Sequence, residues 1–221
     1  MSLKPGVILG IVVVGLAALL ILSNGTPTTP EGFPLVDNVN TYKQQIIEAN
    51  DKVKPLIIKA ESGDDLTDQD VATLIESGKK LDNANRFQPN RVVPFLYAGK
   101  AYQFANLPEL AEERYKQCLA NLPYQPKDVD PKILQTGYEA HYRLSEILFN
   151  RGDYKTSLDE AMKAMTGEPE SPDYLAATAN ALIQLKREPE ASVLLTKSLT
   201  LAPKHRMSVG LAKMLGMAVP K

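Results

Sequence analysis

Four prolines recur at a fixed spacing from residue 89 onward in this 221-residue chain. Pro89 and Pro123 are 34 residues apart, and so are Pro169 and Pro203. The interval from Pro123 to Pro169 is 46 residues, which is 34 plus 12, and the extra length falls in a Pro- and Asp-rich stretch. Proline stops a helix because it has no amide hydrogen to donate to the helical ladder. The spacing therefore predicts stacked helical hairpins, each about 34 residues long.

One period, "RGDYKTSLDEAMKAMTGEP", shows how such a hairpin is specified. Gly152 permits the tight turn between two helices, where a positive φ costs little. Small residues at 157, 161 and 164 allow the second helix to approach its neighbours closely. Pro169 ends that helix, and Ser171 followed by Pro172 is typical of the start of the next one.

The same pattern of bulky, small and aromatic positions occurs three times in phase. The three copies hold Phe95, Ala98, Gly99, Tyr102, Ala111, Tyr115 and Cys118; then His141, Leu144, Ser145, Leu148, Ser157, Ala161 and Ala164; then Leu175, Thr178, Ala179, Leu182, Ala191, Leu195 and Ser198. This pattern resembles the tetratricopeptide repeat (TPR) family. The resemblance implies an all-α fold, a right-handed superhelical α-solenoid of helical hairpins whose first helices line a concave face.

The repeat pattern divides the chain into segments. We predict TPR repeats at 90–123, 136–169 and 170–203, with an inserted loop at 124–135. Residues 38–89 are predicted to form a helical hairpin and a possible degenerate repeat. In it, Pro55 kinks or restarts the first helix, and Thr67 to Asp70 form a capping box that opens the second. Residues 204–221 read as a C-terminal capping helix over the open edge of the last repeat.

The N-terminus carries a different signal. Residues 6–22 contain no polar side chain, and as a helix they would extend roughly 25 Å, near the short end of a membrane span. We predict a transmembrane signal-anchor at 1–25 and a Pro/Gly/Thr-rich linker at 26–37. Lys4 precedes the run and the next Lys or Arg is Lys43, which favours a single-pass protein of the cell membrane with an extracytoplasmic repeat domain. The alternative is a cleaved signal peptide.

No residue pattern predicts chemistry. Lys plus Arg total 25 and Asp plus Glu total 26, so the strong basic field of a nucleic-acid-binding protein is missing. His141 and Cys118 fall at packing positions, and His205 falls in a turn. The acidic residues at 64, 65, 68 and 70 lack the glycine and terminal glutamate of a calcium loop. We predict a protein that is not an enzyme, with no catalytic residue, metal, cofactor, nucleic-acid partner or small-molecule substrate.

The resemblance instead predicts partner binding on the concave face. The predicted groove residues are Lys100, Gln103, Phe104, Tyr142, Glu146, Phe149, Asn150, Asn180, Ile183 and Gln184. We expect the polar ones to contribute little to packing, whereas Phe104 and Phe149 could equally be buried between repeats. The Lys/Asn/Arg carboxylate clamp of one TPR subfamily is missing at the matching positions, which hold Leu96, Lys100, Arg143, Asp173 and Ala177.

The leading functional hypothesis is a membrane-anchored TPR scaffold that binds a protein or peptide ligand in this groove. Two alternatives stay open. One is a structural subunit of a larger envelope complex, and the other, if the N-terminus is cleaved, is a secreted periplasmic TPR factor.

Overall fold

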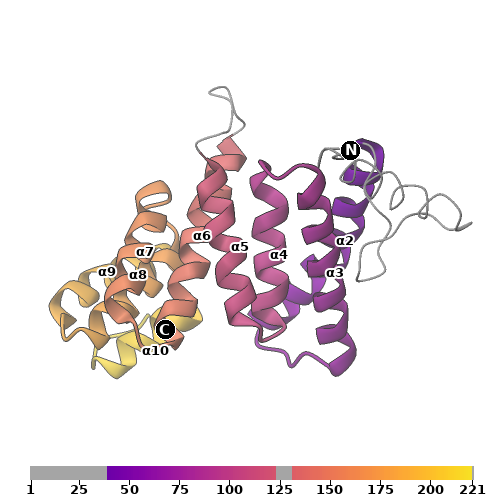
Figure 1. The fold of residues 1–221 in the computed structure, drawn as a ribbon. Helices are drawn as coiled ribbons and strands as arrows, with labels where there is room; N and C mark the ends of the chain where they lie inside the picture. The colour runs from indigo at the N-terminus through magenta and orange to yellow at the C-terminus, as the bar shows by residue number, and fades with distance from the viewer. Residues whose placement is uncertain (1–38, 123–130, 221) are drawn as a thin grey trace, which may run out of the picture.

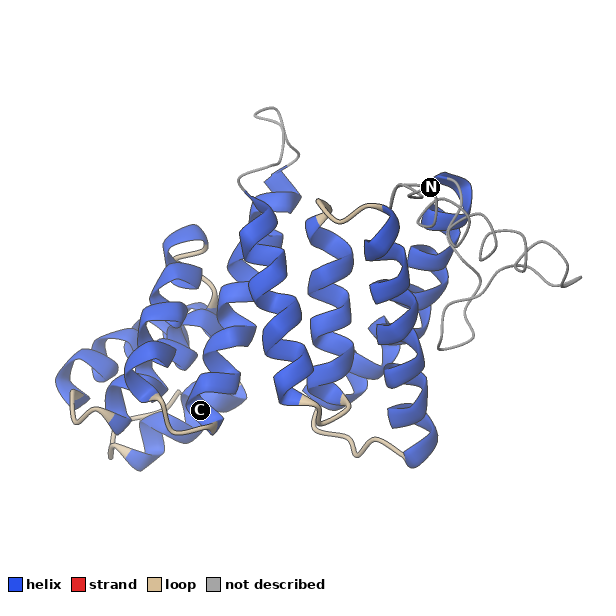
Figure 2. Ribbon diagram, in the orientation of Figure 1, coloured by secondary structure: helices blue, strands red, loops and turns tan. Residues whose placement is uncertain are grey.

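A computed structural model describes residues 39–122 and 131–220 of the chain. Every regular element in these two ranges is a helix (Figure 2). In chain order they are α2 (Val39–Glu61), α3 (Asp68–Phe87), α4 (Val92–Phe104), α5 (Pro108–Asn121), α6 (Pro131–Asn150), α7 (Tyr154–Gly167), α8 (Pro172–Gln184), α9 (Glu188–Leu201) and α10 (Arg206–Met214). The predicted anchor at 1–25, the linker at 26–37, Pro123 at the end of the first predicted repeat and residues 124–130 of the predicted loop lie outside the described residues. Within 39–122 and 131–220, no helix has the length and apolar content that crossing a membrane requires.

The helices form a row of hairpins, α2–α3, α4–α5, α6–α7 and α8–α9, followed by α10 (Figure 1). Each helix packs against the next along the chain. In addition, α2 contacts α4, α4 contacts α6, α6 contacts α8, and α8 contacts α10. The first helices of successive hairpins therefore form an inner layer. The second helices, α3, α5, α7 and α9, form an outer layer, as in a solenoid built from repeated hairpins.

The turn inside each of the last three hairpins has the same backbone conformation. Asn106, Gly152 and Lys186 all have a positive φ, of 59°, 86° and 62°. In each turn the amide of the following residue donates to the carbonyl five residues back, for example from Asp153 to Leu148 at 3.0 Å. These bonds provide donors for carbonyl groups that would otherwise be unpaired at the C-terminal end of the helix. The expectation that Gly152 supplies a positive φ is confirmed, and the same turn recurs where the sequence has no glycine.

Small residues sit where paired helices touch. Ala111, Ala164 and Ala191 are fully buried, and Ala161 is nearly so. At Gly99 on α4, an added Cβ would lie 2.5 Å from the Tyr115 ring on α5. Any larger residue at this position would push the two helices apart, which explains the small residues of the repeat pattern.

In the first hairpin, the predicted cap of α3 is confirmed, but the predicted restart of the first helix at Pro55 is not observed. Thr67 caps α3 in the predicted capping box, accepting from the Asp70 amide while Asp70 accepts from the Thr67 amide. By contrast, α2 runs as a single helix through Pro55 and does not restart there. Proline removes one hydrogen bond, but Val53 and Ile57 on either side of Pro55 are buried against α3 and α4, and this packing outweighs the loss.

The helix after the predicted loop begins earlier than its sequence pattern suggests. Residues 131–135, which we predicted as the end of the inserted loop, already belong to α6. Pro131 suits the first position of a helix, because an amide hydrogen at that position would have no partner within the helix and proline lacks one. Ile133 then packs against the central hydrophobic cluster, which stabilises the additional turn.

Helix α10 lies at the end of the row, where the predicted capping helix was placed. Leu211 and Leu215 pack, half-buried, against a cluster that includes Leu182, Ala191 and Leu195 of the last hairpin. These contacts remove apolar surface from solvent at the open end of the solenoid, which is what a terminal unit in such a stack has to do.

Candidate functional site

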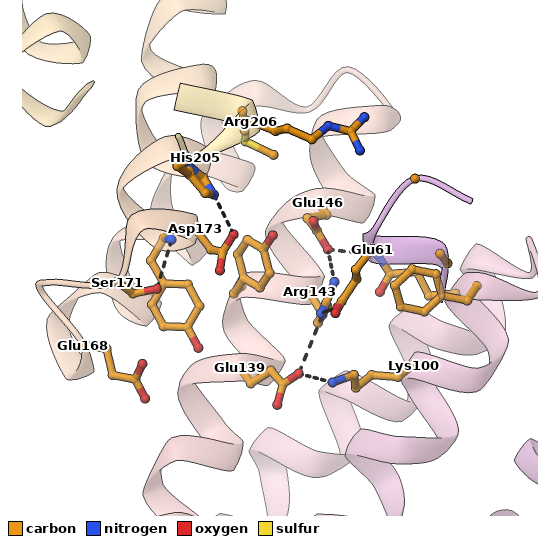
Figure 3. A pocket seen from close by; sticks show the side chains of 17 residues that line it. Glu61, Lys100, Glu139, Arg143, Glu146, Glu168, Ser171, Asp173, His205 and Arg206 are labelled. Carbon is orange, nitrogen blue, oxygen red and sulfur yellow. Dashed lines mark hydrogen bonds and ion pairs between the residues drawn. The ribbon is translucent and has the colours of Figure 1, made fainter. Parts of the chain in front are cut away.

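A cavity of about 830 Å³ opens on the inner layer of helices (Figure 3). Its walls come from α2 and the turn after it, from α4, α6 and α8, from the segment that joins α7 to α8, and from the start of α10. The lining residues are Ala60, Glu61, Gly63, Lys100, Gln103, Phe104, Glu139, Tyr142, Arg143, Glu146, Glu168, Ser171, Asp173, Tyr174, His205, Arg206 and Met207. Segments distant in sequence thus converge on one hollow because every hairpin turns its first helix inward.

Arg143 of α6 is the central cation of the cavity. Its side chain is only 9% exposed, and its guanidinium pairs with Glu61 of α2 and, at 3.1 Å, with Glu146 of its own helix. It also lies over the rings of Phe104 and Tyr142, 5.5 and 5.0 Å from their centroids. Burial lowers the pKa of Arg143, but the surrounding Glu146, Tyr115, Tyr142 and Glu61 outweigh it and raise the pKa above its usual value. Arg143 is therefore fully charged and paired with two carboxylates, while its buried Nε has no hydrogen-bond partner among the described residues.

The other polar side chains of this wall are also paired. Lys100 on α4 forms an ion pair with Glu139 on α6. Gln103 donates to Glu146 at 3.1 Å and accepts from the buried Tyr115 hydroxyl at 2.6 Å. These bonds tie α4 and α5 to α6. They give Gln103 and Glu146 a role in packing that we did not expect from the sequence.

Two tyrosines form a further part of the wall. The rings of Tyr142 on α6 and Tyr174 on α8 are tilted by 37° with centroids 5.1 Å apart. Each side chain is 7% exposed, and Tyr138 and Met165 pack against the pair. The expectation that Tyr142 contributes little to packing is therefore wrong, because its ring joins two repeats. Burial is the first cause that raises the pKa of both phenols, so both are neutral at physiological pH.

The start of α10 closes the rim of the cavity. Arg206 reaches back to the turn between α2 and α3 and donates to the Ser62 carbonyl at 3.0 Å. His205 caps α10 by accepting from the Ser208 amide, while its Nε2 lies 2.9 Å from the Asp173 carboxylate. The first hairpin and the last helix, 144 positions apart at this bond, thus meet across the hollow.

A second, smaller cavity of about 190 Å³ continues the concave face. It shares Gln103, Glu146 and Met207 with the larger one and adds Ser145, Phe149, Asn150, Ser157, Ala177 and Asn180. Phe149 is partly covered, since its ring meets Tyr154 edge-on at 5.2 Å. Asn180 of α8 remains half-buried in the wall.

The structure brings most of the predicted groove residues together. Lys100, Gln103, Phe104, Tyr142 and Glu146 line the larger cavity, and Phe149, Asn150 and Asn180 line the smaller one. Two others lie elsewhere. Ile183 is 7% exposed and packs in the hydrophobic cluster of the last hairpin, and Gln184 is exposed at the end of α8 outside both cavities. A one-residue difference in helical phase is 100°, enough to turn Ile183 from the groove into the core.

Sequence reasoning missed several lining residues. Glu61, Arg206 and Met207 come from the first hairpin and the capping helix, which carry no clear copy of the repeat. Glu168 and Ser171 lie in the connection between hairpins. Tyr174 directly follows Asp173 at the start of α8. No local signal marks these positions, because their meeting depends on the curvature of the whole stack.

The remaining reactive side chains lie away from the cavities. Cys118 is fully buried, and burial raises the pKa of its thiol to about 12, which keeps it protonated and unreactive. His141 Nδ1 lies 2.6 Å from Glu160 of α7 and so joins the two helices of one hairpin. Asp70 belongs to the α3 cap and pairs with Lys59. In the part of the chain that the structure describes, no group of three His, Cys, Asp or Glu residues is arranged to hold a metal ion.

No model of a known protein family matches the sequence, and no curated protein matches it. Among solved structures, a crystal structure of MamA superposes with a TM-score of 0.54 at 19% sequence identity, over 66% of this chain and 81% of MamA. The MamA RS-1 ArsTM double mutant superposes with a TM-score of 0.58 at 15% identity, over 82% of this chain and 83% of that one. Together with hairpins of this period and turn geometry, the superpositions decide the fold. It is a TPR-like α-solenoid. At these identities the likeness to MamA concerns the fold alone.

Proposed function

We propose that this protein is an interaction scaffold that binds a segment of a partner protein in the concave cavity. The observation that carries the proposal is the composition of that cavity. Eight of its lining residues are charged, namely Glu61, Lys100, Glu139, Arg143, Glu146, Glu168, Asp173 and Arg206. Small-molecule sites are lined predominantly by apolar and aromatic groups with few polar ones. A wide polar hollow with an aromatic wall suits instead a peptide, whose backbone and side chains both need hydrogen-bond partners.

The continuity of the two cavities supports an extended ligand. They share three lining residues on α4, α6 and α10, so a chain lying along the inner layer would pass from one to the other. The amides of Asn150 and Asn180 in the smaller cavity offer donors and acceptors to a peptide backbone. The larger cavity offers the ionic groups that select side chains.

The proposal is tested by filling the cavity. Ala60 and Met207 line it from α2 and α10 and are not fully buried, so Ala60→Trp with Met207→Trp would place two indoles in the hollow with little effect on the core. The matched control is Lys155→Trp with Lys197→Trp, on exposed positions of the outer helices α7 and α9. Peptides selected by the full-length protein from a random library are then labelled and titrated by fluorescence anisotropy, with folding checked by circular dichroism.

We expect the cavity pair to weaken binding by about tenfold or more, that is by about 1.4 kcal/mol, and the outer pair to leave it unchanged. If the outer pair abolishes binding and the cavity pair does not, the partner docks on the convex face. The hypothesis of a structural subunit of a larger assembly then replaces the scaffold.

We further propose that residues 6–22 hold the scaffold at a membrane, as a single-pass anchor with the repeats on the extracytoplasmic side. The uninterrupted apolar run and the preceding Lys4 support this. After extraction of membranes with alkaline carbonate, the intact 24.2 kDa chain should stay in the pellet. A soluble form that begins near Thr26 would contradict the anchor and favour a secreted periplasmic factor.

A further inference from the structure

One buried polar group in the wall of the larger cavity has no hydrogen-bond partner. Among the described residues, five buried side-chain nitrogen or oxygen atoms lack one, and they belong to Asn50, Ser77, Asn85 and Arg143. Of these residues, Arg143 alone lines either of the two cavities described above. Its unpartnered atom is Nε, which carries one hydrogen to donate. A buried donor without an acceptor costs free energy, and an acceptor on a bound ligand would remove that cost.

The rest of the Arg143 guanidinium is occupied. Its two terminal nitrogens donate to Glu61 and Glu146. The rings of Phe104 and Tyr142 lie against it, with centroids 5.5 and 5.0 Å from Cζ. The donors of a guanidinium point outward in one plane, so the hydrogen on Nε leaves from an edge that neither of these glutamates engages. That edge is the part of Arg143 that remains for a ligand.

Glu139 lies beside this edge. One of its carboxylate oxygens is 3.8 Å from Nε of Arg143, which is too far for a hydrogen bond. The same oxygen accepts from Lys100 on α4, and the Glu139 side chain remains 30% exposed. Nε of Arg143 and the Glu139 carboxylate thus place a donor and an acceptor next to each other in the cavity wall (Figure 3).

The charge around this edge disfavours an anionic ligand. Two cations, Arg143 and Lys100, are paired there with three carboxylates, those of Glu61, Glu139 and Glu146. Three negative charges against two positive ones leave a net charge of −1. A carboxylate bound at Nε would add a fourth negative charge to the same wall, where like charges repel. A neutral acceptor avoids this repulsion.

A neutral group with a carbonyl oxygen and an N–H on the same side fits both atoms. Its carbonyl would accept from Nε of Arg143, and its N–H would donate to Glu139. The carboxamide of an asparagine or glutamine side chain has this arrangement. So does one residue of an extended backbone, whose N–H and C=O face the same neighbour, as in paired antiparallel strands. An ammonium group would satisfy Glu139 but not Nε, because it has no acceptor.

We propose that Nε of Arg143 and the carboxylate of Glu139 form an amide-recognition site in the larger cavity, which binds one carbonyl and one N–H group of the partner peptide. This inference rests on the proposed function, since it names the chemical groups by which the cavity holds its peptide. The two groups come either from an asparagine or glutamine side chain or from one extended residue of the peptide backbone, and the experiment separates these sources.

The first measurement observes the donor in the unmodified, full-length protein. Arginine Nε–H groups give their own resonances in heteronuclear NMR spectra, and the one that is lost in Arg143→Lys belongs to Arg143. When a peptide selected from a random library saturates the protein, this resonance should shift. Its hydrogen exchange with water should slow by about tenfold or more, the effect of one hydrogen bond to a charged group. The control is Arg114, whose Nε already donates to Asp82 at 2.6 Å away from both cavities.

The second measurement identifies the source of the amide with variants of the selected peptide. Each asparagine or glutamine is replaced by norleucine, and each backbone amide is replaced in turn by an ester. One replacement should weaken binding about tenfold, both to the wild-type protein and to Arg151→Lys, the matched change at an exposed arginine outside both cavities. In Arg143→Lys, whose folding is checked by circular dichroism, the same replacement should cost about threefold or less, since both changes act on one interaction.

The outcomes separate the inference from the function on which it rests. A sensitive side-chain position assigns the amide to asparagine or glutamine, and a sensitive ester position assigns it to the backbone. An Arg143 Nε–H resonance that does not respond to a cavity-bound peptide, or a replacement whose cost is undiminished in Arg143→Lys, would refute the amide site and leave the proposed function intact. Tighter binding when glutamate replaces glutamine at the sensitive position would identify an anion site instead. Failure to select any peptide that the cavity-filling Trp pair displaces would refute the proposed function itself.

Discussion

At the scale of single residues, the burial of an ion pair decides what it contributes. Arg143 and Arg151 both pair with glutamates, but the Arg143 side chain is 9% exposed and that of Arg151 is 47% exposed. Removing one partner of a buried pair leaves the other charge desolvated and unpaired. In an exposed pair, water solvates the charge that remains. Glu112, the partner of Arg151, also retains Lys116 at 2.6 Å.

We therefore expect Arg143→Met to lower the free energy of unfolding by about 3 kcal/mol and Arg151→Met by less than about 1 kcal/mol. Arg143→Lys should fall between them because lysine cannot bond Glu61 and Glu146 with one planar group. Urea unfolding followed by circular dichroism measures all three. Equal losses for Arg143→Met and Arg151→Met would mean that the network in the cavity does not hold α2 to α6.

At the scale of the helical hairpin, the recurring turn uses a conformation that the sequence does not always suit. Lys186 adopts a φ of 62°, whereas Gly152 occupies the same place in the preceding hairpin. A left-handed conformation costs a residue with a Cβ roughly 1–2 kcal/mol. Replacement by glycine removes this cost, but the greater conformational freedom of glycine in the unfolded chain offsets part of the gain in stability.

The net expectation is that Lys186→Gly stabilises the protein by about 0.5–1 kcal/mol. Asn106→Gly should gain less, because asparagine tolerates this region better. Gly152→Ala should be destabilising by a similar amount. Melting temperatures of the three variants rank them, and a Lys186→Gly variant that melts lower than wild type would show that the turn geometry is wrong.

The contact between the two helices of a hairpin is the other feature at this scale. Ala161 on α7 is 1% exposed, and its neighbour Met162 is 48% exposed. Ala161→Arg should lower stability by about 4 kcal/mol or more, because it forces a charge and extra volume into a closed interface. Met162→Arg should be within about 0.5 kcal/mol of wild type. Thermal melts that do not separate the two would contradict the repeat register.

These elements show what the sequence could and could not predict. Proline spacing and small residues predicted the hairpins, and Thr67 and Gly152 predicted a cap and a turn, because each signal acts within a few residues. Of the two alternatives at Pro55, a restart of the helix was wrong, and the early start of α6 was missed, because packing of Val53, Ile57 and Ile133 overrides local preference. Most groove positions followed from helical phase, but Glu61 and Arg206 reach the cavity only through the curvature of the stack.

At the scale of the whole molecule, the stack is stabilised by contacts between neighbouring units, so its end depends on α10. Leu211 covers the cluster of the last hairpin, while Met214 on the same helix is 59% exposed. Loss of the cap should therefore loosen the C-terminal repeat before the rest.

We expect Leu211→Glu to reduce hydrogen-exchange protection in α8 and α9 while leaving α3, α4 and α5 nearly unchanged. Met214→Glu, the control, should leave all helices protected. A uniform loss of protection along the chain would indicate that the solenoid opens as one cooperative unit rather than from its end.

The central claim is that a partner peptide lies in the concave cavity. The chain contains no tryptophan, so Phe104→Trp places a single fluorophore in the cavity wall and Lys197→Trp places one on the outer layer. When a selected peptide is added, the emission of the Phe104→Trp protein should shift and saturate with the dissociation constant measured by anisotropy, while that of Lys197→Trp stays constant. A response from Lys197→Trp with none from Phe104→Trp would contradict the claim.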